Sequence, residues 1–126
     1  MLLQLDFSCE TPIYRQIHDQ IVLRIACGNL ISGEKLPTIR ALANEAGINM
    51  MTASKAYQLL KQEGHITTDR RGGTIVAGCC ASSHIEATLA ELKLTAASSK
   101  LSGMGRENWL DLCAQAYDSL NLSEKE

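Results

Sequence analysis

Basic and hydrogen-bonding side chains gather in three short stretches of this 126-residue chain. The first runs from Lys35 to Arg40, the second from Asn49 to Lys55, and the third is the turn Asp69-Arg70-Arg71-Gly72-Gly73. Arginine and lysine bind phosphate oxygens, and arginine also pairs with the O6 and N7 atoms of guanine. Asparagine, serine and threonine hydrogen-bond phosphates or base edges. These residue types are therefore the ones that contact nucleic acids.

Catalysis and metal binding have no comparable set of residues. The sequence contains no nucleophile–base pair, no phosphate loop and no paired carboxylates with a plausible site. Its three histidines are scattered, and its five cysteines follow no CxxC spacing. The adjacent Cys79 and Cys80 could sense an oxidant or a soft metal, but no basic residue lies nearby to activate them. We expect reduced thiols, no metal, no cofactor and no enzymatic activity.

The formal net charge of −2 argues weakly against a nucleic-acid partner, but the charges are unevenly distributed. Residues 1–81 contain eight Lys and Arg against seven Asp and Glu, whereas residues 82–126 contain four against seven. A nucleic-acid site needs local basic groups rather than a basic chain. The chain has no apolar run long enough for a membrane span and no signal peptide at its start, so we expect a cytoplasmic protein.

An amphipathic helix is predicted near the start of the chain. Isoleucines recur there at every fourth position, which places them on one helix face. The preceding Thr-Pro pair favours a helix start, and Gly28 favours its end. The pattern predicts a helix from about Thr11 to Cys27, followed by a turn-rich connection over residues 29–37.

Two shorter helices follow with almost no chain between them. Thr38 can cap the first and Gly47 can end it, while Asn49 can cap the second, which stops at Gly64. Their apolar residues recur at helical spacing: Ile39, Leu42, Ala43 and Ala46, then Ala53, Ala56, Tyr57 and Leu60. Two short helices joined by a tight turn with glycine are typical of a helix-turn-helix.

A β-hairpin is predicted directly after the second of these helices. The β-branched runs Ile66–Thr68 and Thr74–Ala77 indicate two strands. The turn between them carries Arg70 and Arg71. A hairpin with a basic tip at this place converts the helix-turn-helix into a winged helix-turn-helix.

The last third of the chain differs in character. A capping box opens a helix that is predicted to run to about Thr95, and residues 97–105 form a Ser- and Gly-rich connector. A final helix is predicted from about Arg106 to Leu120. We therefore expect a mainly α fold with a small β-hairpin. It comprises a winged helix-turn-helix DNA-binding domain in residues 1–81 and a two-helix dimerisation tail in residues 82–126.

The motifs over residues 11–77 follow one another in a specific order. They are PIYRQI at 12–17, GEKLPTIRALA at 33–43, GIN at 47–49, KAYQLL at 55–60 and RRGGTIVA at 70–77, together with Thr52 and Glu63-Gly64. In this order they resemble the GntR superfamily of bacterial transcription regulators, and within it the short YtrA-type branch. The resemblance implies binding to double-stranded operator DNA. Short members of this branch often repress nearby transporter operons, so the resemblance also implies a repressor.

Two departures from the family pattern fall at positions expected to face DNA. Met50 and Met51 stand where the family usually has small or polar residues. The sequence Arg71-Gly72-Gly73-Thr74 replaces the usual Gly-x-Gly-Thr of the wing. Both changes leave the fold intact, but an operator sequence cannot be carried over from the family.

The second helix of a helix-turn-helix enters the major groove with its first turns, and a basic wing suits the minor groove. Together with the resemblance, this predicts a DNA interface made of Lys35, Thr38, Arg40, Asn49, Met50, Met51, Thr52, Ser54, Lys55, Arg70, Arg71, Gly72 and Gly73.

Several of these residues have a structural alternative. Asn49 could read adenine or serve only as a helix cap, and Thr38 could bind a phosphate or only cap its helix. Arg40, which contacts DNA by resemblance, could instead pair with Glu34 or Glu45. The two methionines could touch thymine methyls or be packing residues, and the wing arginines could be solvated surface charge.

One winged domain reads too few bases for useful specificity, which favours a homodimer on a pseudo-palindromic operator. The tail helices supply the apolar faces, and the predicted interface consists of Ile85, Leu89, Leu92, Trp109, Leu112, Ala116 and Leu120. The alternative function is a winged-helix protein-interaction module that no longer binds DNA. A small-molecule effector is left unknown, because residues 82–126 show no converging polar cluster.

Overall fold

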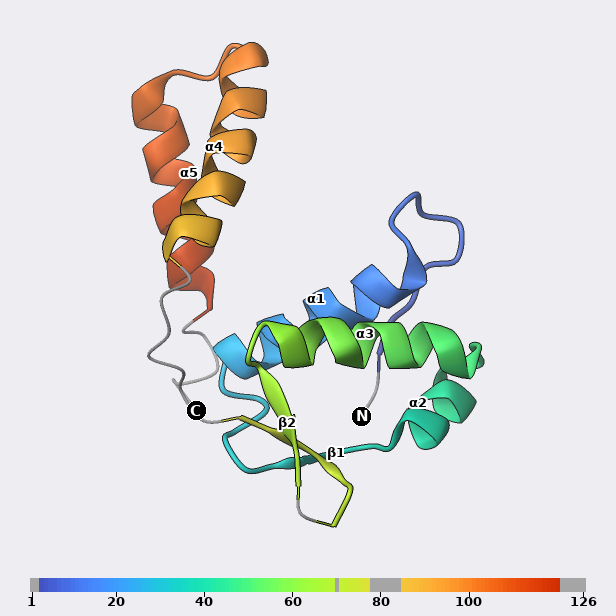
Figure 1. Cartoon of the computed structure of the whole chain (residues 1–126). Helices are drawn as coiled ribbons and strands as arrows, with labels where there is room; N and C mark the ends of the chain where they lie inside the picture. Colours follow the sequence, from blue (N-terminus) through green and yellow to red (C-terminus); the bar gives the residue numbers. More distant parts are fainter. Residues whose placement is uncertain (1–2, 70, 78–84, 121–126) are drawn as a thin grey trace. The chain divides into compact units, whose positions relative to one another are not determined.

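The computed structural model describes residues 3–69, 71–77 and 85–120. The chain divides into two compact units, Met1–Cys80 and Ala81–Glu126, each of which has its own internal contacts (Figure 1). The first unit contains α1 (Ile13–Ala26), β1 (Lys35–Leu36), α2 (Ile39–Ala46), α3 (Met50–Gln62), β2 (Ile66–Thr68) and β3 (Thr74–Val76). The second contains α4 (Ile85–Leu101) and α5 (Arg106–Ser119).

Local capping sets the ends of α2 and α3. The hydroxyl of Thr38 accepts a hydrogen bond from the backbone N–H of Ala41 at 3.1 Å, and the Oδ1 atom of Asn49 accepts one from Met51 at 2.7 Å. Gly47 ends α2 with a left-handed φ of 68°, a conformation that costs glycine little. The predicted caps of both helices are confirmed, so only Gly47, Ile48 and Asn49 separate them.

The predicted start of α1 is wrong by two residues. Its N-cap is Pro12, whose carbonyl accepts hydrogen bonds from Arg15 and Gln16 at 3.1 Å, and no side chain caps the helix. Thr11 therefore lies before the cap rather than providing it, and the helix begins at Ile13. Proline needs no N–H partner, so its place at this helix end leaves no additional donor unsatisfied.

A three-stranded antiparallel sheet with strand order β1-β3-β2 completes the first unit. Ile66 pairs with Val76 and Thr68 with Thr74 in the hairpin. The sequence indicated β2 and β3 but not β1. Its residues Lys35 and Leu36 pair with Ile75 and Thr74 of β3, far along the chain. Two residues are too few to show an alternating pattern, so this strand has no local signal.

The core of the first unit lies between the three helices and the sheet. Ile17 and Ile21 of α1, Leu60 of α3 and Val76 of β3 are almost completely buried. The apolar residues predicted for the inner face of α3 are all buried: Ala53, Ala56, Tyr57 and Leu60. This core holds α2 and α3 in a fixed mutual arrangement, which the site described below requires.

The second unit is a helical hairpin in which α4 and α5 lie side by side. The predicted end of the first helix near Thr95 is wrong, because α4 continues to Leu101. The segment predicted to be a connector contains serines whose hydroxyls donate hydrogen bonds to helix carbonyls four residues earlier. Ser99 donates to the Thr95 carbonyl and Ser102 to the Ser98 carbonyl, both at 3.0 Å. Gly103, with a φ of 90°, then turns the chain.

None of the described helices is both long and apolar enough to cross a membrane.

Candidate nucleic-acid interface

The start of α2 presents Thr38 and Arg40 at the surface of the first unit. Both residues are exposed. The salt bridges among the described residues all involve His18 or His65, so the proposed pairing of Arg40 with Glu34 or Glu45 is absent. The guanidinium of Arg40 is therefore available to an external anion or to a base edge.

The start of α3 is also open to solvent. Met51 is 79% exposed and Met50 is 47% exposed, so Met51 is not a packing residue in this unit. Asn49 is exposed as well, although its side-chain oxygen is used as the cap of α3. Thr52 and Ser54 are half-buried along the same helix. The first turn of α3 thus offers an uncovered surface with both apolar and polar groups.

Lys55 is exposed and is held by a cation–π contact. Its Nζ atom lies 4.2 Å from the centre of the Tyr14 ring on α1. Such contacts contribute about 0.5–1 kcal/mol at exposed sites. The contact restricts the amine to one side of α3 without neutralising its charge.

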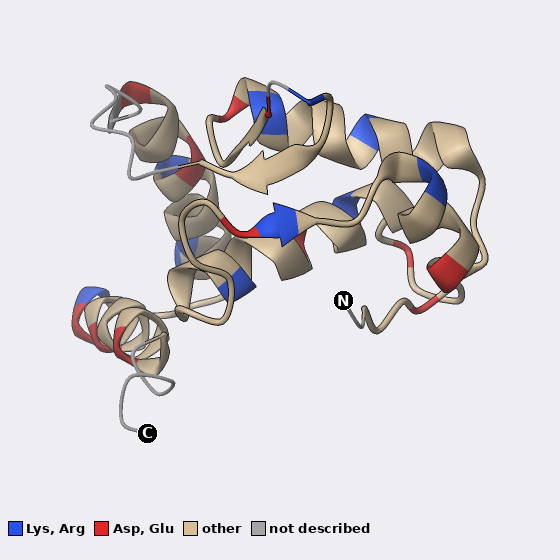
Figure 2. Ribbon diagram, turned by 90° about the horizontal axis from the view of Figure 1, so that it is seen from below, with Lys and Arg blue, Asp and Glu red and all other residues tan. Residues whose placement is uncertain are grey.

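The turn between β2 and β3 is fixed by two backbone hydrogen bonds. Asp69 donates its N–H to the carbonyl of Gly73 at 2.6 Å, and Gly72 donates to Asp69 at 2.9 Å. Gly72 has a φ of 83°, which explains a glycine at this position. Arg71 is exposed beside it, whereas Arg70 lies outside the described residues. Figure 2 shows basic positions on β1, α3 and this turn; the one on β1 is the exposed Lys35.

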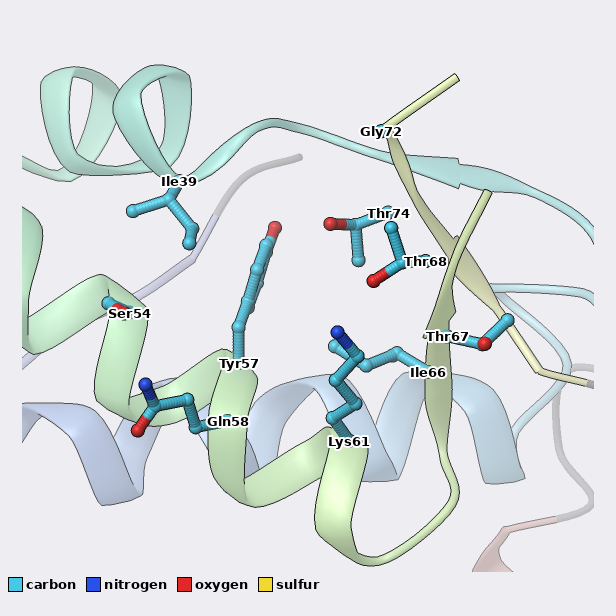
Figure 3. Close-up of a pocket in the computed structure, with 10 residues that line it drawn as sticks. All are labelled: Ile39, Ser54, Tyr57, Gln58, Lys61, Ile66, Thr67, Thr68, Gly72 and Thr74. Carbon is cyan, nitrogen blue, oxygen red and sulfur yellow. The ribbon is translucent and has the colours of Figure 1, made fainter. Parts of the chain in front are cut away.

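A cleft of about 290 Å³ lies between α3 and the hairpin (Figure 3). The sequence interpretation missed four of the polar residues that line it: Gln58, Lys61, Thr68 and Thr74. The helical spacing of positions 54, 58 and 61 could have indicated a shared polar face of α3, but the facing strand residues depend on the tertiary fold.

Tyr57 forms a wall of this cleft and ties α3 to the segment before α2. Its hydroxyl donates a hydrogen bond to the carbonyl of Pro37 at 2.7 Å. Burial and the nearby carboxylate of Glu45 raise the pKa of Tyr57 above its ordinary value. The hydroxyl therefore stays protonated and keeps donating at any physiological pH.

Two histidines that look scattered in the sequence meet at the end of α3. His18 is 7% exposed, and its Nδ1 and Nε2 atoms lie 2.8 Å from Asp19 and 2.6 Å from Glu63. The Nε2 atom of His65 lies 3.3 Å from the same Glu63 carboxylate. No cluster suited to a metal ion occurs among the described residues, so we interpret the contacts as a fastening of α1 to α3.

We expect Glu63→Gln to lower the free energy of unfolding by about 1 kcal/mol, because a charge-assisted hydrogen bond to buried His18 is weakened at a partly exposed site. Urea unfolding followed by circular dichroism at neutral pH measures this. The matched control is Glu10→Gln, at an exposed position of the same unit, which should change stability by less than about 0.5 kcal/mol. Equal stabilities of the two variants would contradict the fastening role.

The apolar residues predicted for an interface lie on a hairpin that leaves them largely uncovered. Leu89, Leu92 and Leu112 are 50%, 47% and 46% exposed, and Ala116 is also exposed. Trp109 and Leu120 are half-buried, and Ile85 is the first residue of α4. No side chain of α5 is buried, and the described side chains of α4 are exposed or half-buried.

Helix α2, a three-residue turn and α3 form a helix-turn-helix, and the β2–β3 hairpin follows it as a wing. The first unit is therefore a winged helix-turn-helix.

Comparison with known proteins agrees with this class. Residues 13–76 match the model of the gntR family, bacterial regulatory proteins. The HTH-type transcriptional repressor YtrA of Bacillus subtilis (strain 168) is 39% identical over 94 residues, which cover 75% of this chain and 68% of YtrA.

Two solved structures extend the comparison. A transcriptional antiterminator from Listeria monocytogenes EGD-e has a TM-score of 0.84 at 28% identity, with 95% of this chain and 92% of that chain covered. The DNA-binding domain of AraR in complex with operator ORE1 has a TM-score of 0.51 at 28% identity, with 61% and 94% covered. The protein described here belongs to the gntR family of bacterial transcription regulators.

Proposed function

We propose that this chain is a sequence-specific DNA-binding repressor that acts as a homodimer on a pseudo-palindromic operator. In each protomer the first turn of α3 enters the major groove, and Arg40 binds a guanine or a phosphate next to this turn. The wing with Arg71 approaches the minor groove. The observation that carries the proposal is that Arg40 is exposed and has no carboxylate partner among the described residues, beside the uncovered first turn of α3.

The relatives support a DNA partner, but their names differ in the kind of regulation. The AraR domain, whose structure contains operator DNA, shares the winged fold over 61% of this chain. YtrA is named a repressor, whereas the Listeria protein is named an antiterminator. Repression is proposed on the identity to YtrA, which is higher at 39% than the 28% to the Listeria protein.

The homodimer is proposed from the second unit. A helical hairpin without a buried side chain in α5 gains stability mainly by packing against another surface. A second copy offers the same apolar face, and a two-fold pair of hairpins would place two winged units on half-sites about one DNA turn apart. Leu92 and Leu112, which are 47% and 46% exposed, are two of the residues that we propose for that face.

Binding of the purified full chain to a labelled duplex from its own upstream region tests the proposal. Fluorescence anisotropy should give binding that is tighter than to an unrelated duplex of equal length and that weakens steeply with salt. No binding even at low salt would favour the alternative, a winged module for protein partners. A reporter gene under that upstream region, with and without the regulator, then decides between repression and activation.

A further inference from the structure

The cleft between α3 and the wing is not explained by the DNA contacts predicted from the sequence. Among the described residues that line it, only Ser54 and Gly72 belong to that predicted set. Its walls come from one face of α3 and from strands β2 and β3, and Ile39 of α2 closes one end (Figure 3). The cleft thus lies between the two elements proposed to enter neighbouring grooves of DNA.

Hydrogen-bonding side chains line both walls of the cleft. Gln58 and Lys61 lie on one face of α3, three residues apart. Thr68 and Thr74 are direct partners on adjacent strands, so their side chains lie on the same side of the sheet. In Figure 3 their hydroxyls point toward α3, whereas Thr67 points to the other side of β2.

The side chains that line the cleft favour a ligand with an anionic group attached to an uncharged group. Lys61 is exposed, and no Asp or Glu is among the described residues that line the cleft. The Tyr57 hydroxyl is already used in its bond to Pro37, so this ring presents an apolar surface together with Ile39 and Ile66. One ammonium, an amide and two hydroxyls beside apolar walls suit a phosphate attached to a sugar.

The geometry of duplex DNA indicates which part of the DNA would lie in the cleft. The major and minor grooves are separated by a sugar–phosphate strand. If α3 occupies the major groove and the hairpin tip reaches the adjacent minor groove, that strand must pass between them and therefore across the cleft. We propose that the cleft binds one sugar–phosphate unit of this strand, with Lys61 and Gln58 on one side of the phosphate and Thr68 and Thr74 on the other. The inference rests on the proposed function and adds a phosphate site to it.

Substitution of Lys61 tests the site through the salt dependence of binding. Lys61→Gln should weaken binding to the upstream duplex and to an unrelated duplex by the same factor, because a phosphate contact carries no sequence information. The slope of log K against log salt should become shallower by about 0.9 per half-site. The affinity deficit should therefore shrink roughly 3-fold per half-site between about 50 mM and about 200 mM salt. Lys61→Arg should restore the wild-type slope.

Two further variants separate this site from general effects. Lys93→Gln removes an exposed lysine of α4 and should leave affinity and slope unchanged. The double substitution Thr68→Val and Thr74→Val removes both hydroxyls at similar side-chain volume, and it should weaken binding with the wild-type slope retained. Thermal unfolding of each variant verifies that the first unit is folded.

Three outcomes would overturn the proposal. The first is that Lys61→Gln keeps the wild-type salt slope while Arg40→Ala weakens DNA binding. This result would contradict the phosphate site in the cleft but not the DNA-binding function. The second is that the wild-type protein binds no DNA, which would contradict both the phosphate site and the DNA-binding function. Deoxyribose 5-phosphate that stabilises the free wild-type protein at micromolar concentration, but not Lys61→Gln, would assign the cleft to a free sugar phosphate instead.

Discussion

Arg40→Ala should weaken operator binding by about 5- to 150-fold per half-site, the equivalent of about 1–3 kcal/mol for a lost arginine contact to guanine. The side chain is exposed at the start of α2 and has no carboxylate partner within residues 3–69, 71–77 and 85–120, so its removal should cost the free protein little. Anisotropy titrations with the upstream duplex measure the loss, and urea unfolding should show an unchanged stability.

Arg40→Lys distinguishes the two contacts proposed for this residue. Lysine keeps the charge but not the planar fork that pairs with guanine. A phosphate contact predicts that Arg40→Lys recovers most of the affinity, whereas a guanine contact predicts that discrimination between operator and unrelated DNA is still reduced. The matched control is Arg106→Ala at the exposed start of α5. An Arg40→Ala variant that binds as tightly as Arg106→Ala would contradict a DNA role for Arg40.

The double substitution Leu92→Glu and Leu112→Glu should convert the protein to a monomer and reduce operator affinity at least about 100-fold. Buried carboxylates would be unpaired in the proposed interface, and a monomer loses the gain from two linked half-sites. Light scattering coupled to gel filtration gives the mass, and anisotropy gives the affinity.

Ala114→Glu is the control for this pair, since Ala114 is exposed on the side of α5 opposite Leu112. It should leave both the mass and the affinity unchanged. A wild-type protein that is monomeric at micromolar concentration, or a Leu92→Glu and Leu112→Glu variant that remains dimeric, would refute the proposed interface. Tyr57 and the core of the first unit lie in a separate compact unit, so the fold of the winged unit should persist in this variant.

The sequence predicted the helix-turn-helix well because its signals are local. Thr38 and Asn49 each cap a helix within three residues, and Gly47 needs only its own φ to end α2. The sequence left open whether Met50 and Met51 are exposed or packed, and the structure leaves Met51 79% exposed.

Features that depend on distant partners were not predictable in this way. Strand β1 forms only because Lys35 and Leu36 meet β3. The contact between His18 and Glu63 joins residues 45 positions apart, and no spacing rule connects them. The extension of α4 was missed for a different reason: serine favours turns by its own propensity, yet it can also bond to the carbonyl four residues earlier in a helix.

The sparse packing between α4 and α5 has a consequence for how operator occupancy depends on the concentration of the protein in the cell. A pair of helices in which α5 has no buried side chain is marginal alone, so in the proposed homodimer its folding would draw on the free energy of association. Folding of the tail and pairing of two chains then become one event whose extent depends on protein concentration. At low copy number most chains would be unpaired, and operator occupancy would rise more steeply than linearly as synthesis increases, which gives the regulator a threshold.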